Sequence, residues 1–278
     1  FTIKPNIYGT LAARLTRTRA LATVSGLGSA FLAGGPTGRL IDRLYRLSLS
    51  GAQAVFFQNE EDRELFLERR LVRREQVRRV PGSGIDLAHF GLSPLPNGSP
   101  QRFLFIGRLL WDKGVREFVE AARLVASSGH RAEFHILGEC GVDNPSAVTL
   151  AEVERWAADG IIRYLGPTDD VRPAIAAADC IVLPSYREGV PRSLLEGAAM
   201  GRPLIATDVP GCRDVVEDGD NGFLCAPRSA SALADAIRRM LQLEPEEQVA
   251  MGRRSREKLE REFAVERVVA AYRSELAT

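Results

Sequence analysis

Apolar and polar positions follow two alternating patterns along almost the whole chain. Short continuous apolar runs, such as CIVLP at 180–184 and RFLFIG at 102–107, are typical of strands that are buried on both faces. Longer segments follow them, with apolar residues three or four positions apart, as in LAEVERWAA at 150–158. Strands of this kind alternating with helices predict an α/β fold, in which helices cover both faces of a parallel sheet.

The pattern places the elements as follows. Strands are expected at 20–25, 54–58, 77–81, 102–107, 132–138, 161–166, 180–184 and 203–208. Helices are expected from residue 6, at 38–50, from 60, from 113, at 150–158, at 171–178, after residue 190, from 229, from 246 and at 265–277.

Residues 91–101, GLSPLPNGSPQ, interrupt this alternation with three prolines, two glycines and two serines. Such a composition is typical of a linker, so we expect one domain at 1–93 and a second at 94–278, with the last helix packing back toward the first domain. The chain begins at Phe1, and its first element has the character of a mid-domain segment. The first domain is therefore expected to be truncated at its N-terminus.

Charge is balanced overall but uneven along the 278 residues, which carry a formal net charge of +1. Residues 1–95 hold 14 Lys and Arg against 8 Asp and Glu, and the remainder holds 23 against 28. The overall balance argues against a nucleic-acid binder. The basic first part fits a solvated helix face and an anionic membrane surface equally well. Its arginines crowd at Arg69, Arg70, Arg73, Arg74, Arg78 and Arg79.

Cysteine and histidine usage predicts a protein of a reducing compartment without a metal site. The four cysteines are scattered with no CxxC pair, and the three histidines form no ligand cluster. No apolar run approaches the roughly 20 residues of a membrane span, and no signal peptide is visible. We therefore expect a cytoplasmic location.

Candidate chemistry begins in the loop FIGRLLWDKG at 105–114, where Gly107 and Arg108 leave a strand and Lys113 opens the next helix. Arginine offers a planar fork to phosphate oxygens, lysine a compact charge, and a helix start adds partial positive charge. This arrangement suits a diphosphate. Two ordinary surface cations would give the same spacing.

The stretch SYREGVPRSLLEGAAMG at 185–201 places one carboxylate on each side of a helix start. Glu188 precedes the helix, Gly189 lets a ligand approach the backbone, Pro191 suits the first turn, and Glu196 follows on the helix. Free N–H groups near Val190 would point at a bound anion. The two acids could then bracket a phosphate and accept hydroxyl groups from both sides of it, as in a sugar nucleotide. A first-turn acid and a surface acid would be the ordinary alternative.

With these motifs the sequence resembles the retaining glycosyltransferases of family four, whose GT-B fold has two Rossmann-like domains. The match lies in Glu-x7-Glu at 188–196, GR-x4-K at 107–113 and the run from LPSYREG to NGFL at 183–224. FTIKPNIYG, VSGLGSAF and PGSGIDLAHF point to the branch that builds capsular and exopolysaccharides. The resemblance implies transfer of a sugar from a nucleotide diphospho-sugar, such as a UDP-sugar, to a lipid-linked saccharide. No metal or other cofactor is implied.

The resemblance also assigns roles to residues. Arg108, Lys113 and Glu188 would be catalytic, the first two by holding the diphosphate and the third by contacting the donor sugar. Glu196 would bind the ribose, and Tyr164 to Gly166 would lie near the base, although core packing explains the Tyr164 ring as well. The implied donor-binding set is Gly107, Gly138, Tyr164, Gly166, Ser185, Gly189, Val190, Pro191 and Glu196.

A further loop, from Gly26 to Gly28, would face the cleft from the first domain; a tight turn is the alternative reading of both glycines. Many family members carry a histidine there, and this chain does not. Two other functions stay open: a UDP-sugar epimerase of the same fold, and a sugar-nucleotide-binding subunit without catalysis. Whether this chain is active by itself is also open.

Overall fold

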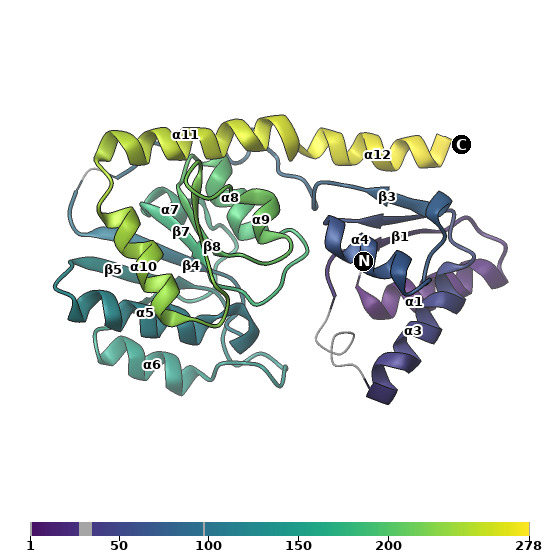
Figure 1. The fold of residues 1–278 in the computed structure, drawn as a ribbon, viewed down its shortest axis with the longest axis horizontal. Helices are drawn as coiled ribbons and strands as arrows, with labels where there is room; N and C mark the ends of the chain where they lie inside the picture. Colours follow the sequence, from purple (N-terminus) through teal and green to yellow (C-terminus); the bar gives the residue numbers. More distant parts are fainter. Residues whose placement is uncertain (1, 28–34, 97, 278) are drawn as a thin grey trace. The chain divides into compact units, whose positions relative to one another are not determined.

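A computed structural model describes residues 2–27, 35–96 and 98–277 of the chain (Figure 1). The chain forms two compact units. Unit 1 comprises residues 1–84, 188–191 and 263–278, and unit 2 comprises residues 85–187 and 192–262. The domain boundary expected between residues 93 and 94 stays a prediction.

The described strands of unit 1 form a parallel sheet of three, in the order β1-β2-β3. Its core gathers around β2, of which all four residues are buried. The C-terminal helix α12 belongs to this unit: the Tyr272 ring lies 4.2 Å from the ring of Phe56, and its hydroxyl is 2.6 Å from that of Thr23. The elements are α1 (Ile3–Leu15), β1 (Leu21–Val24), α3 (Gly35–Leu49), β2 (Ala54–Phe57), α4 (Glu60–Glu68), the short 3-10 helix η1 (Arg74–Gln76), β3 (Val77–Arg79) and α12 (Val265–Ala277).

The described strands of unit 2 form a parallel sheet of six, in the order β6-β5-β4-β7-β8-β9. The strand bounds are β4 (Gln101–Ile106), β5 (Ala132–Leu137), β6 (Arg163–Tyr164), β7 (Cys180–Leu183), β8 (Leu204–Thr207) and β9 (Gly222–Cys225). Every residue of β7 and β8 is buried. The prediction of parallel strands covered on both faces is therefore confirmed.

Helices cover both faces of this sheet: α5 packs with α10 on one face, and α8 with α11 on the other (Figure 1). Their bounds are η2 (Trp111–Lys113), α5 (Val115–Ser127), α6 (Leu150–Ala158), α7 (Arg172–Ala176), α8 (Arg192–Ala199), α9 (Cys212–Val215), α10 (Ala230–Leu241) and α11 (Pro245–Glu262).

Three elements differ from the sequence-based expectation. The helix expected from Lys113 begins at Val115, because Gly114 takes a left-handed φ of 74° and separates α5 from the 3-10 turn η2. The strand β9 and the four-residue helix α9 were not expected. Both are short, and β9 is recognisable only as the apolar stretch after Gly222, which pairs with β8.

A buried arginine holds the segment that leads into β4. Arg202 is fully buried and donates from Nε to the Ile175 carbonyl at 2.9 Å. Its terminal nitrogens donate to the carbonyls of Ser93 at 3.1 Å, Pro94 at 3.0 Å and Ala176 at 3.2 Å. Burial lowers the pKa of Arg202 to about 10. The expected linker is thus fixed to the core of unit 2 on this side.

Candidate functional site

The strand order of unit 2 contains a topological switch point. The chain proceeds from β4 to β5 and β6 on one side, and then returns to place β7, β8 and β9 on the other side of β4. In open parallel sheets, ligands bind outside the carboxyl ends of the strands at such a reversal. The loop with Gly107, Arg108 and Lys113 leaves β4, and Ser185 follows β7. Both predicted loops therefore leave the two strands that flank the switch point.

Backbone contacts join these two loops. The carbonyl of Asp112 accepts hydrogen bonds from the Tyr186 amide at 2.9 Å and from the Ser185 hydroxyl at 3.3 Å. A Cβ placed on Gly114 would lie 2.0 Å from the carbonyl oxygen of Pro184, so the approach leaves no room for any side chain there. Ser185 is itself buried, and its own carbonyl accepts from the Thr207 hydroxyl. The residues around Lys113 are thus held tightly against the start of the β7 loop.

Three predicted glycines lie next to one another at the ends of β4, β5 and β6. The Gly107 amide donates to the Leu137 carbonyl at 3.0 Å, and the Gly138 amide donates to the Gly166 carbonyl at 3.0 Å. A Cβ on Gly138 would lie 1.9 Å from the Gly107 carbonyl oxygen. These glycines therefore allow the loops to approach each other, which is a structural use that sequence reasoning did not assign to them.

The two candidate cations lie in the loop after β4. The Arg108 side chain is exposed, and that of Lys113 is half-buried at the end of η2. An exposed guanidinium and a half-buried ammonium at the carboxyl end of a parallel sheet can both approach an anion from solvent.

Glu196 differs from the surface acid that sequence reasoning offered as its ordinary reading. Only 8% of the residue is exposed, and its carboxylate accepts from Nε of Arg192 at 3.1 Å. Burial raises the pKa of Glu196, and the Arg192 charge opposes that effect. A buried carboxylate at the second turn of α8, with a raised pKa, is the kind of group found at ligand sites.

Tyr164 is engaged through its hydroxyl, which donates to the Gly138 carbonyl at 2.9 Å and lies 3.5 Å from the Cys140 sulfur. Burial is the largest cause that raises the pKa of Tyr164 to about 12. The ring is half-buried. Both of its interpretations, a wall of the base site and core packing, stay predictions.

The segment Glu188–Pro191 belongs to unit 1. Asn59 donates from Nδ2 to the Gly189 carbonyl at 3.2 Å, and Gln58 Oε1 accepts from the Val190 amide at 3.3 Å. The expectation of a free N–H at Val190 is therefore wrong, because a side chain at the end of β2 occupies it.

Gly189 and Gly26 are packed together in the same unit. A Cβ on Gly189 would lie 2.1 Å from the Ser25 carbonyl oxygen, and one on Gly26 would lie 3.2 Å from the Gly189 nitrogen. Gly26 takes a φ of 131°, as a tight turn requires. Pro191 stands directly before α8. Gly28 lies outside the described residues.

Sequence reasoning missed several residues around these loops. Glu117, Tyr186 and Gly114 support the loop that carries Lys113, and Gln58 and Asn59 hold the backbone of residues 188–190. A left-handed glycine directly after Lys113 could have been inferred from the KG pair at 113–114. The long-range pairs left no signal in a single sequence.

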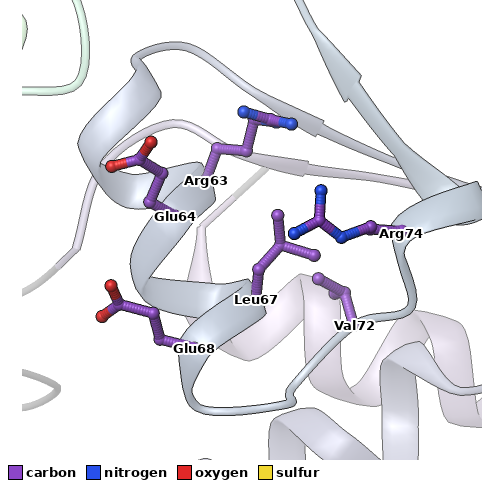
Figure 2. Close-up of a pocket in the computed structure, with 6 residues that line it drawn as sticks. All are labelled: Arg63, Glu64, Leu67, Glu68, Val72 and Arg74. Carbon is purple, nitrogen blue, oxygen red and sulfur yellow. The ribbon is translucent and has the colours of Figure 1, made fainter.

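A hollow of about 510 Å³ lies on unit 1, along α4 and η1 (Figure 2). Leu67, Val72 and Arg74 turn toward one another there, while the side chains of Glu64 and Glu68, which also line the hollow, point away from these three (Figure 2). None of the predicted site residues lines it.

Metal ligands and membrane spans were also sought in residues 2–27, 35–96 and 98–277. No three His, Cys, Asp or Glu side chains in those ranges lie close enough to hold a metal ion. None of the helices in that part of the chain is long and apolar enough to cross a bilayer. All four cysteines are free thiols, and Cys180 is buried.

Several solved structures have a fold similar to that of this chain. The Anabaena protein HepE in complex with UDP-glucose matches with a TM-score of 0.84 and 18% identity, over 99% of this chain and 77% of that one. Sucrose-phosphate synthase from Thermosynechococcus elongatus matches with a TM-score of 0.78 and 21% identity, over 98% and 72%. These likenesses confirm the GT-B type of fold.

Two curated bacterial proteins are related in sequence. An N,N'-diacetylbacillosaminyl-diphospho-undecaprenol alpha-1,3-N-acetylgalactosaminyltransferase from Campylobacter jejuni is 31% identical over 259 residues, or 86% of this chain and 66% of the relative. The putative colanic acid biosynthesis glycosyltransferase WcaL from Escherichia coli is 29% identical over 199 residues, or 68% and 48%. The chain thus spans between about half and two thirds of the length of these relatives.

A family model described as glycosyl transferases group 1 matches residues 100–243, which cover β4 to α10 and include the switch point. This match takes in more than half of the chain, and the sequence resemblance drawn from Glu-x7-Glu and GR-x4-K pointed to the same group. The chain therefore belongs to the glycosyl transferases group 1 family.

Proposed function

We propose that the protein transfers a sugar from a UDP-sugar to a lipid-linked saccharide, with retention at the anomeric carbon, in the assembly of a bacterial cell-surface polysaccharide. The observation that carries this proposal is the pair of joined loops at the switch point of unit 2, with Arg108 and Lys113 on one and Ser185 on the other. The family and the names of the two relatives support it.

The donor diphosphate would bind in the loop after β4. Arg108 offers paired N–H donors to phosphate oxygens, and Lys113 adds a compact positive charge at the end of η2. Both charges would stabilise the leaving nucleotide as its bond to the sugar breaks. The protein supplies this positive charge itself, so the proposal requires no metal ion.

The two glutamates would orient the ends of the donor. Glu196 would accept the ribose hydroxyls, which suits a buried carboxylate that keeps free acceptor capacity beside Arg192. Glu188 would accept hydroxyls of the transferred sugar. With departure and attack on one face of the sugar, a leaving-phosphate oxygen would take the proton from the acceptor hydroxyl. Retention follows from that geometry.

The direct test starts with the donor. Differential scanning fluorimetry with UDP-, GDP- and ADP-sugars should show the largest stabilisation with a UDP-sugar, since a ligand that binds only the folded state raises its stability by mass action. Glu196→Ala should remove most of that stabilisation. Equal stabilisation of the variant would contradict the ribose assignment.

The reaction is tested by incubating the protein with the best UDP-sugar and an undecaprenyl-diphosphate saccharide, with anomeric configuration read by NMR. An α-linked product from an α-linked donor is expected. Free epimerised sugar nucleotide without an acceptor would instead favour the epimerase function. Nucleotide binding with no turnover would favour a binding subunit.

The acceptor's lipid suggests a position at the cytoplasmic face of the membrane, with the basic residues of unit 1 against anionic headgroups. The charge excess of residues 1–95 supports this idea, at about 1 kcal/mol for each cation near the surface. Three of the crowded arginines already have acidic neighbours: Arg69 lies 3.3 Å from Asp42, Arg73 lies 2.6 Å from Glu75, and Arg78 pairs with Glu275. We therefore assign the contact to the exposed Arg70 and Arg74.

Sedimentation with vesicles of phosphatidylcholine and 30% phosphatidylserine tests this contact. The double variant Arg70→Ala and Arg74→Ala is expected to lose about thirtyfold in partition, since two cations at about 1 kcal/mol each amount to about 2 kcal/mol. Partition equal to that of the unaltered chain would overturn the membrane contact and leave the donor chemistry untouched.

A further inference from the structure

Tyr186 holds the Lys113 loop from both sides. Its backbone amide donates to the carbonyl of Asp112 at 2.9 Å, one residue before Lys113. Its hydroxyl donates to Oε1 of Glu117 at 2.7 Å, on the first turn of α5 and four residues after Lys113. A single residue of the β7 loop thus spans the segment that turns from η2 into α5.

The surroundings of this contact keep it in place. The guanidinium of Arg228, from the chain after β9, lies 4.6 Å from the centre of the Tyr186 ring. Burial and the hydrogen bond to Glu117 raise the pKa of Tyr186 to about 12, so its hydroxyl stays a donor at neutral pH. Glu117 is only 8% exposed, and among the described residues its Oε2 has no hydrogen-bond partner.

A buried carboxylate with one unpaired oxygen is costly, and such a group is retained where it serves a purpose. On an exposed face, water would hydrogen-bond both oxygens of a glutamate, and this cost would not arise. Here Oε1 of Glu117 accepts from a tyrosine that comes from the other side of the switch point. The contact therefore lowers the stability of the fold, and in return it fixes the distance between the two loops.

We propose that Tyr186, through its hydrogen bond to Glu117, is a positioning residue that fixes the turn from Lys113 into α5 for the donor diphosphate. This inference rests on the proposed function, because it assumes that Lys113 meets that diphosphate. Tyr186 touches no reacting atom in this account. It acts by keeping the charge of Lys113 where the phosphate arrives.

Loss of the hydroxyl leaves both oxygens of Glu117 unpaired inside the protein. The carboxylate can relieve this only by moving, and the first turn of α5 moves with it. Small displacements of a positioning group cost large factors in binding and rate. The amide contact to Asp112 persists, since it belongs to the backbone, so the loop loosens on one side without unfolding.

Isothermal titration with UDP measures the effect on the intact chain. Tyr186→Phe is expected to raise the Kd for UDP about tenfold, which is a modest part of the range that misplacement can produce. Glu117→Gln keeps a carbonyl oxygen for the Tyr186 hydroxyl and should stay within about twofold of the unaltered chain. Tyr272→Phe is the matched control, because it removes a hydroxyl that pairs with Thr23 in unit 1, and it should leave the Kd unchanged.

Hydrogen exchange provides a readout that needs no ligand. The amides of residues 109–118 should exchange faster in Tyr186→Phe and at the original rate in Tyr272→Phe. Unchanged exchange and an unchanged Kd in Tyr186→Phe would overturn the inference while UDP binding stands. A Glu117→Gln variant as weak as Tyr186→Phe would also overturn it, since charge and not position would then matter. An unaltered chain without affinity for UDP would instead remove the proposed function, and this inference with it.

Discussion

The two sheets differ in the order in which the chain builds them. In unit 1 the described strands are added in one direction, β1, β2 and β3, without a reversal. In unit 2 the chain starts at β4, adds strands on one side and then returns to add three on the other. Both sheets are parallel and both have buried central strands, so composition alone does not separate them.

The reversal is what creates a place for a ligand. Loops that leave neighbouring strands at a switch point turn away to opposite faces of the sheet and leave space between them at the carboxyl ends of the strands. In unit 2 the loops at that point carry Arg108 and Lys113, with left-handed or crowded glycines where the loops meet. The described strands of unit 1 have no such switch point. Arginine content is therefore a poor guide to the phosphate site, since unit 1 holds more of the excess positive charge.

The largest expected effect is on the free energy of unfolding of unit 2, which the buried Arg202 stabilises. Arg202→Met should lower the free energy of unfolding by about 3–5 kcal/mol, because several buried carbonyls lose their donor. Both tryptophans, Trp111 and Trp156, belong to unit 2, so urea unfolding followed by tryptophan fluorescence reports on this unit. The exposed pair of Arg213 and Asp208 gives the control: Arg213→Met should cost under about 1 kcal/mol. Equal losses in the two variants would contradict the role of Arg202.

Next comes the junction of the two loops. Gly114→Ala should cost about 3 kcal/mol and abolish UDP binding, because the new Cβ would meet the Pro184 carbonyl in addition to the left-handed strain. Gly141 has a similar φ of 66° but open space around it, so Gly141→Ala should cost only about 1–2 kcal/mol. Urea unfolding and UDP titration measure both. UDP affinity retained in Gly114→Ala would mean that the junction does not shape the site.

A third prediction compares cations of the two units directly. Arg108→Ala and Lys113→Ala should each weaken UDP binding about 10–100-fold, since charge-assisted bonds to a diphosphate are lost. Arg74→Ala, which removes an exposed arginine of unit 1 beside the hollow, should leave UDP affinity within about twofold. The comparison between units fails if Arg74→Ala is the weaker binder.

The smallest effect is a dependence on pH. Burial raises the folded-state pKa of Glu196, so its favourable contribution is present below the unfolded pKa near 4.5 and is lost as pH rises through the folded value. Glu196→Gln should therefore stabilise the protein by roughly 0.5 kcal/mol at pH 7 and by nothing at pH 4, while UDP binds more weakly. Thermal unfolding at the two pH values checks the sign. A variant less stable than the unaltered chain at pH 7 would show that the Arg192 pair outweighs burial.

Many of the strands and helices could be predicted, because local patterns of apolar residues indicate which segments are buried. The runs CIVLP and RFLFIG became β7 and β4, and LAEVERWAA became α6 with the predicted bounds. The strand β9 was missed since four residues, of which one is half-buried, give too weak a pattern, and only its pairing with β8 defines it. Strand order was also beyond reach, because pairing is decided by contacts between distant residues.

The candidate site residues, too, could be predicted from the sequence only in part. Glycines and charged residues in loops after strands could be selected from their position, and the family model covers most of that region. The engagement of the Val190 amide by Gln58 could not be foreseen, since the partners are 132 positions apart. The burial of Glu196 was likewise invisible, because residues 194–199 of α8 are all buried, so burial does not follow a single apolar face of this helix.

Amide chemical-shift mapping with UDP tests the central claim most directly. In a deuterated, isotope-labelled sample of the intact chain, titration with UDP should shift the amides of Gly107, Arg108, Lys113 and Ser185, at the switch point of unit 2. Shifts concentrated around Arg63 and Arg74 of unit 1, with the loops after β4 and β7 unaffected, would contradict the account.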